Sequence, residues 1–135
     1  MAYKIDEIDG IGPAYREKLT AAGIKNTDHL LEQCCTPKGR KATSETTGVS
    51  EKLLLEWSNM ADLMRVSGVG RQFAELLEAS GVDTIKELRN RNADNLATKM
   101  EEVNTEKKLS KTSPSVSQIK DWVEQAKKTD PKIEY

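Results

Sequence analysis

The sequence predicts an all-α fold made of two pseudo-equivalent halves of short helices packed together. Apolar residues recur at helical spacing along nearly the whole chain, and no segment alternates clearly between apolar and polar residues, although residues 3–8 could be extended. The pattern Ile8-Asp9-Gly10-Ile11-Gly12 returns 58 residues later as Val66-Ser67-Gly68-Val69-Gly70. Such internal similarity indicates one supersecondary unit used twice. We therefore expect a first half in residues 1–65 and a second in residues 66–135, joined in one compact body.

Helix start and stop signals define the first half. Pro13 suits the first position of a helix and Gly23 suits its end, while Thr27 or Asp28 can cap the next helix before Thr36-Pro37 stops it. The expected elements are a helix over 13–22, a helix begun at 27 or 28, a basic turn over 38–41, a helical turn over 44–47, and a longer helix that Ser50 caps and that runs to 61.

The second half repeats this order. Trp122 and Trp57 each lie on an apolar helical stripe after a basic segment, so we expect both in the core rather than as stacking platforms for bases. The expected elements are a helix over 71–80, a short helix begun near 84, a helix begun at 92 or 94, a basic stretch over 107–111, and a last helix opened by Ser113-Pro114-Ser115.

Composition limits the class of protein. The chain is 36% hydrophobic and 32% charged, with a mean hydropathy of −0.66, which is typical of a soluble helical protein. We find no membrane span and no signal peptide, and the adjacent Cys34 and Cys35 suit a reducing compartment, so we expect a cytoplasmic protein without a membrane partner. The net charge of −1 and the pI of about 5.9 count against a strongly basic nucleic-acid binder.

The two glycine turns resemble the helix-hairpin-helix family, whose usual role is sequence-nonspecific binding of the DNA backbone. Each turn is followed by a helix with Leu at the seventh position after the second glycine. The second copy matches better, because Ala74 is the small residue that the family often places four positions after the second glycine, and Arg71 follows the turn directly. The first copy keeps Pro13 but has Arg16 at the small position and Asp9 beside the turn.

A second resemblance covers residues 8–126. The chain is similar to domain-of-unknown-function family 4332, which implies the duplicated helical fold and brings no established activity. The motifs that carry it are Gly10-Ile11-Gly12-Pro13, Gly39-Arg40, Thr47-Gly48-Val49-Ser50, Trp57, Ala61-Asp62-Leu63-Met64-Arg65, Gly68-Val69-Gly70, and Asp121-Trp122 through Ala126.

Phosphate binding by such turns has a simple physical basis. Glycines let the backbone approach a phosphate closely, and the following helix offers unpaired N–H donors with partial positive charge. Contacts of this kind are blind to sequence and sensitive to salt, and only weak binding is expected from one turn and one basic segment. The candidate nucleic-acid-binding residues are Gly68, Val69, Gly70, Arg71, Gly10, Ile11, Gly12, Lys38, Arg40, Lys41, Lys107, Lys108 and Lys111.

No catalytic group stands out in the sequence. His29 is the single histidine and lies five residues from Cys34, which is a poor spacing for a paired nucleophile and base on one helix face. We expect no enzyme activity, no cofactor and no metal site. Two function classes remain: a module that binds nucleic acid through the phosphate backbone, and a helical protein-interaction or assembly module in which the glycine turns only pack helices together.

Overall fold

The computed structural model describes residues 2–135, which form a short 3-10 helix and eight α-helices and no strand. The predicted all-α class is therefore confirmed. The elements are η1 (Ile5–Glu7), α1 (Pro13–Ala21), α2 (Thr27–Cys34), α3 (Pro37–Thr47), α4 (Glu51–Leu63), α5 (Arg71–Ala79), α6 (Ile85–Leu88), α7 (Ala93–Lys107) and α8 (Val116–Lys127).

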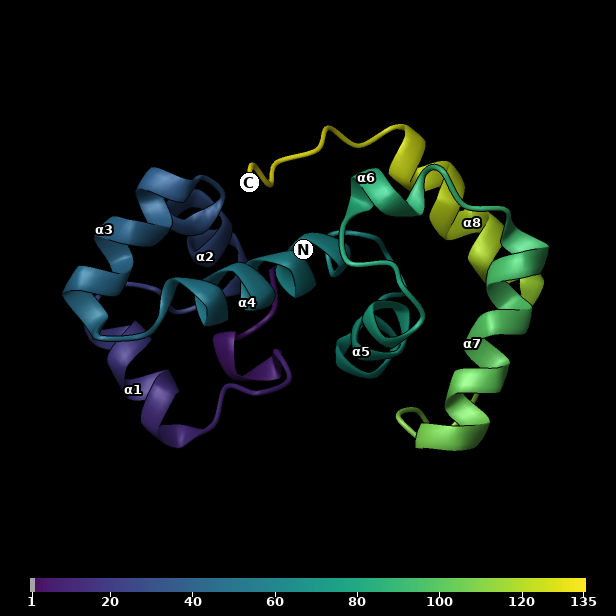
Figure 1. Ribbon diagram of the computed structural model, residues 1–135, viewed down its shortest axis with the longest axis horizontal. Coiled ribbons are helices and arrows are strands. Elements are labelled where there is room, and N and C mark those ends of the chain that lie inside the picture. The colour runs from purple at the N-terminus through teal and green to yellow at the C-terminus, as the bar shows by residue number, and fades with distance from the viewer. Residues whose placement is uncertain (1) are drawn as a thin grey trace.

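The helices form two groups, and α4 contacts α5 where the two groups meet. Helix α4 packs on α2 and α3, whereas α8 packs on α6 and α7. Figure 1 shows α1 to α3 on one side of the molecule and α6 to α8 on the other. The contact between α4 and α5 joins the two groups, together with Asp62 near the end of α4, whose Oδ2 accepts a hydrogen bond from the N–H of Ile85 at 2.9 Å.

The prediction of a basic turn over residues 38–41 is wrong, because these residues belong to α3. Thr36 caps that helix through its hydroxyl, which accepts from the N–H of Gly39 at 3.1 Å, and Pro37 takes the first helical position. The Thr36-Pro37 pair thus ends one helix and also begins the next. The helical turn expected over 44–47 is the last part of this same helix.

Two smaller expectations also change. Asn26 caps α2, with its Oδ1 accepting from the N–H of His29 at 2.8 Å, in place of Thr27 or Asp28. In the segment that could be extended, Lys4 forms a single antiparallel bridge with Asn26, and residues 5–7 form the 3-10 helix.

Both tryptophans lie in the core, as the helical stripes predict. Trp57 and Trp122 are 3% and 2% exposed. Trp57 meets Tyr15 edge to face, with ring centroids 5.0 Å apart, and Trp122 meets Phe73 at 5.2 Å. Each tryptophan therefore holds the helix that follows a glycine turn.

The C-terminal segment, residues 129–135, returns from α8 to the first group of helices. Figure 1 shows it passing along the top of the view from α8 toward α2 and α3. There the N–H of Glu134 donates to the carbonyl of Cys35 at 2.7 Å, and Ile133 packs against the core. The chain end thus bridges the two groups of helices.

Candidate anion-binding turns

The two glycine turns have the same backbone conformation. Gly10 and Gly68 both have a φ of +94°, a value that L side chains rarely adopt. The next residue in each turn, Ile11 or Val69, donates its N–H three residues back, to Ile8 at 3.2 Å or Val66 at 3.1 Å. The repeated sequence therefore produces a repeated shape.

The indole ring of a tryptophan packs against the first glycine of each turn. A Cβ built on Gly10 would lie 3.2 Å from Nε1 of Trp57, and one built on Gly68 would lie 3.1 Å from Nε1 of Trp122. The first glycine of each turn is thus required for two reasons, its positive φ and the close approach of the indole ring.

The middle residue of each turn serves the fold rather than a ligand. The side chains of Ile11 and Val69 are buried, and their N–H groups are already used inside the turns. The structure therefore leaves neither an exposed side chain nor a free N–H at either position for a phosphate to contact.

Free N–H groups lie instead at the first turns of α1 and α5. A side chain caps the N-terminus of each of the other six α-helices in residues 2–135, but Gly12 and Gly70 provide none for α1 and α5. Within the described chain, the N–H groups of Gly70, Arg71 and Gln72 have no acceptor, and the same holds for Gly12 and Ala14. Unpaired N–H groups at a helix start attract anions.

The second glycine of each turn is not required by the fold. Gly12 and Gly70 have φ values of −88° and −94°, and a Cβ at either would meet nothing within 4 Å. Larger residues fit both positions without strain. Because glycine has no side chain, it leaves the N–H groups at the start of the following helix accessible to a ligand.

The two turns are neighbours. Nη2 of Arg71 lies 3.3 Å from Oδ1 of Asp9, and both side chains are about half exposed. The acid beside the first turn therefore pairs with the base that follows the second. In this arrangement Asp9 competes with any anion for Arg71.

The second basic stretch lies beside the second turn. Gln72 links them, because its Oε1 accepts from the N–H of Lys111 at 3.3 Å. Lys107 ends α7, Lys108 follows it with a φ of +54°, and both are exposed, as Lys111 is. Lys107, which lines a hollow with Asp9, and the main chain of Lys111 thus lie near the second turn.

Carboxylates share this neighbourhood. Burial and then the charge of Asp9 raise the pKa of Glu75, and burial followed by Glu56 raises that of Glu78. Both glutamates line a hollow of about 290 Å³ together with Asp9 and Lys107. The surface next to the second turn therefore carries charges of both signs.

The first basic segment does not join the turns. Lys38 and Lys41 are exposed on α3, and no contact within residues 2–135 links them to either glycine turn. Arg40 is buried, with Nη1 donating to the carbonyl of Cys34 at 3.0 Å and Nη2 to that of Glu134 at 2.7 Å. As the chain is folded here, Arg40 holds the C-terminal segment and is not open to a ligand.

The cysteines and the histidine lie apart from the turns. Cys34 is buried, and burial raises the pKa of its thiol, which disfavours the reactive thiolate. Nδ1 of His29 accepts from the N–H of Lys25 at 3.2 Å. The burial of Cys34 and the hydrogen bond of His29 therefore both serve the fold.

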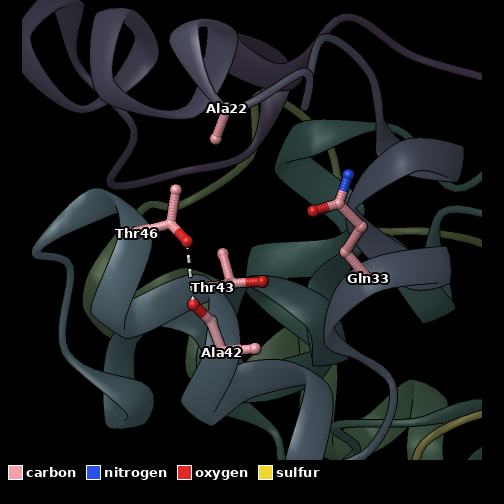
Figure 2. Close-up of a pocket in the computed structure, with 5 residues that line it drawn as sticks. All are labelled: Ala22, Gln33, Ala42, Thr43 and Thr46. Atoms are coloured by element: carbon pink, nitrogen blue, oxygen red, sulfur yellow. Dashed lines mark hydrogen bonds between the residues drawn. The ribbon is translucent and has the colours of Figure 1, made fainter.

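A small cavity lies between the end of α1 and helices α2 and α3 (Figure 2). It measures about 180 Å³, and its lining holds hydroxyl and amide groups but no ionisable side chain. Thr46 there donates its hydroxyl to the carbonyl of Ala42 at 3.1 Å. The lining residues are Ala22, Gln33, Ala42, Thr43 and Thr46.

Two further structural features concern metal binding and membrane insertion in residues 2–135. No group of three or more His, Cys, Asp or Glu side chains there is arranged to hold a metal ion. No helix in that range is long and apolar enough to cross a membrane.

Sequence reasoning missed two polar residues that shape the second turn. Gln125 of α8 holds Ser67, with Oε1 accepting from its N–H at 2.9 Å and Nε2 donating to its carbonyl at 3.2 Å. Gln72 connects the turn to the second basic stretch. Neither glutamine stands out when the repeats are aligned. Ala14 lies 58 positions before Gln72, and Met60 matches Gln125 when Trp57 is aligned with Trp122.

Comparison with known proteins places the chain in a family. The family model described as Domain of unknown function (DUF4332) matches residues 9–129, so the chain belongs to that family. No curated protein and no solved structure matches it.

Proposed function

We propose that this member of the DUF4332 family binds the phosphate backbone of DNA, without regard to sequence, through its second glycine turn. The observation that carries the proposal is the pair of uncapped helix starts. Six α-helices of residues 2–135 have a side-chain cap, and the two that lack one both follow a Gly-apolar-Gly turn. A phosphate oxygen would supply the missing acceptor.

We infer that the halves are two copies of a helix-hairpin-helix unit, covering residues 1–65 and 66–135. In support, the turns share their φ value, each is closed by a tryptophan, and α2 with α3 packs on α4 as α6 with α7 packs on α8.

The second turn is favoured over the first for electrostatic reasons. Arg71 follows Gly70 directly, and Lys107, Lys108 and Lys111 lie nearby. The first turn instead has Pro13 at the position of Arg71, and Asp9 stands beside it. With about four phosphate contacts, the logarithm of the affinity should fall with the logarithm of the salt concentration with a slope of about −4.

A titration of labelled DNA, duplex and single-stranded, at two salt concentrations tests the proposal. We expect binding at about 50 mM salt that weakens as salt rises, and that Gly70→Glu or Arg71→Glu abolishes while the circular dichroism spectrum stays unchanged. Lys99→Glu is the matched control for Arg71→Glu, because Lys99 is exposed on α7 and its change in charge is the same. The absence of DNA binding at about 50 mM salt would refute the proposal.

Assembly with a protein is the second candidate function. The net charge of −1 and the carboxylates of Asp9, Glu75 and Glu78 beside the second turn favour it. Under this alternative the glycine turns only pack helices, and the variants Gly70→Glu and Arg71→Glu leave DNA binding, if there is any, unaffected.

A further inference from the structure

Three arginines from separate parts of the chain hold the C-terminal segment, residues 129–135. Arg89 follows α6 and donates Nη2 to the carbonyls of Ala126 and Thr129, at 3.1 and 2.5 Å. Arg65, which follows α4, donates Nη2 to the carbonyl of Asp130 at 3.0 Å. Arg40 of α3 donates Nη2 to the carbonyl of Glu134 at 2.7 Å. The three guanidinium groups thus lie in the order in which the segment passes them.

Most of the positive charge in this row is not compensated. Arg65 is paired with Asp62, its Nη1 lying 2.7 Å from Oδ1. Within the described residues, Arg40 and Arg89 form no ion pair, and the buried Nε of Arg89 has no acceptor. Their hydrogen-bond partners are neutral carbonyl oxygens, so neither guanidinium is in direct contact with a carboxylate of the described residues.

The arginines recognise the main chain of the segment and not its side chains. Every hydrogen bond from the three arginines to the segment goes to a carbonyl oxygen, and Ile133 is the one side chain of residues 129–135 that packs on the core. A chain of phosphate groups would present a similar row of oxygens with formal charge. A phosphate adds opposite formal charge to these hydrogen bonds and can accept two parallel N–H groups of one guanidinium, neither of which a neutral carbonyl offers.

We propose that Arg40, Arg65 and Arg89 form a second anion-binding site, which the segment 129–135 occupies until a chain of phosphate groups displaces it. The site shares the ligand chemistry of the proposed function but uses none of the residues of the glycine turns. The phosphate chain can come from a nucleic-acid backbone or from a free polyphosphate.

Displacement is favoured by charge and opposed by the tether. A segment attached by a few residues competes at an effective concentration on the order of millimolar. The apparent affinity for the anion then equals the intrinsic affinity multiplied by the fraction of molecules in which the segment is released. A change that loosens the segment should therefore strengthen anion binding without adding any contact.

Hydrogen exchange at the amide of Glu134, followed by NMR in the full chain, reports on the segment directly. This amide donates to Cys35 and is protected while the segment is docked. We expect its exchange to accelerate when inorganic tripolyphosphate or DNA is added in separate experiments. Acceleration by tripolyphosphate shows that a free phosphate chain suffices, and acceleration by DNA alone assigns the site to nucleic acid. If neither probe changes the exchange, the proposal is overturned.

Ile133→Ser tests the competition. Because it removes the apolar contact that helps to dock the segment, it should strengthen tripolyphosphate binding by about tenfold. Leu53→Ser is the control, since Leu53 is also partly buried against the core but lies on α4, outside the segment and the basic stretch. An equal affinity in Ile133→Ser and the unchanged protein would contradict the proposal.

Two further variants separate this site from the glycine turns. Arg89→Gln in the Ile133→Ser background should cancel the gain in affinity, whereas Gly70→Glu in that background should preserve it. If Gly70→Glu removes DNA binding but the tripolyphosphate gain persists, both proposals stand. If the gain disappears with Gly70→Glu, the anion binds at the turn and the arginine site is wrong.

Discussion

Gly39 shows how a single residue sets the distance between two helices. A Cβ at this position would lie 2.1 Å from the carbonyl oxygen of Gln33, a main-chain atom at the end of α2. The contact cannot be relieved by rotating a side chain, so α2 and α3 would have to move apart.

We predict that Gly39→Ala lowers the free energy of unfolding by about 3 kcal/mol in urea denaturation, the upper range for overpacking. Gly12→Ala is the control, because a Cβ there meets nothing. That change should stay within about 1 kcal/mol of the unchanged protein, since the entropy gained is offset by a poorer helix cap. Equal stabilities of the two variants would contradict the packing argument.

Asp9 is the residue that limits anion binding at Arg71. The pair is exposed, so its ion pair contributes little to stability. We predict that Asp9→Asn leaves the melting temperature within about 2 °C and strengthens DNA binding about threefold, because a competing carboxylate is lost. Asp6→Asn is the control, since Asp6 pairs with Arg16 and not with Arg71. A weaker affinity in Asp9→Asn would show that the ion pair positions Arg71 for binding.

Glu75 makes stability depend on pH. Burial and Asp9 raise the pKa of its carboxyl above the unfolded value near 4.5, so the folded state binds the proton more tightly. The contribution of this group to stability is therefore complete below about pH 4.5 and is lost as pH rises through the folded pKa.

Glu75→Gln should thus be more stable than the unchanged protein at pH 7, and the difference should vanish near pH 4. Urea unfolding at the two pH values measures it. A difference that is the same at both pH values would rule out titration of Glu75 as the cause.

At the scale of the elements, the helix ends were the most predictable feature. Ser50 caps its helix as the sequence predicts, and Thr84 and Ser115 cap helices that begin where the sequence predicts a start. Gly23 and Gly81 follow α1 and α5 closely. These signals are local, since a hydroxyl or a glycine acts within one turn of its own position.

Helix α3 could not be predicted in the same way because it has no apolar stripe. Its buried residues are Arg40 and Thr43, and the burial of Arg40 depends on carbonyls of Cys34 and Glu134, the second of them 94 positions away. A basic run with a glycine is more typical of a loop than of a half-buried helix. The carbonyl partners that allow this arginine to be buried are visible only in three dimensions.

The glycine turns are the elements on which the fold depends most directly. We predict that Gly68→Ala costs about 2 kcal/mol in urea unfolding and changes the fluorescence of Trp122, since the new methyl group combines a positive φ with contact at the indole. Gly70→Ala, two residues away, should leave the fluorescence unchanged. Equal emission spectra for the two variants would show that the indole does not close the turn.

At the scale of the whole molecule, the sequence predicted the all-α class and the tryptophans of the core but not how the halves are connected. The Asp9–Arg71 pair spans 62 positions, and the C-terminal segment docks through main-chain atoms, which carry no side-chain signal. The repeat predicts two similar units. It does not show which surfaces of the units meet.

The same limit applies to the candidate site. Gly70 and Arg71 could be identified from the sequence, because a glycine turn and a helix start depend only on residues close together in the chain. The structural role of Ile11 and Val69 could not be predicted, because their N–H groups form hydrogen bonds inside the turns that are visible only in the folded chain. The mixed charge beside the second turn arises from residues of α5, α7 and the N-terminal segment that meet only in the folded chain.

The central claim is that the free N–H groups at the start of α5 bind phosphate, and Gly70→Asp tests it most directly. The backbone at Gly70 already has cap-like angles, so an Asp side chain can take up these N–H groups and should raise the free energy of unfolding by about 0.5 kcal/mol. Asn92→Asp, which adds the same charge at the cap of α7, is the control.

In an anisotropy titration with duplex DNA at about 50 mM salt, we predict that Gly70→Asp loses at least about tenfold in affinity while Asn92→Asp binds nearly as the unchanged protein does. A Gly70→Asp protein that is folded, more stable and still binds DNA with unchanged affinity and salt dependence would contradict the claim.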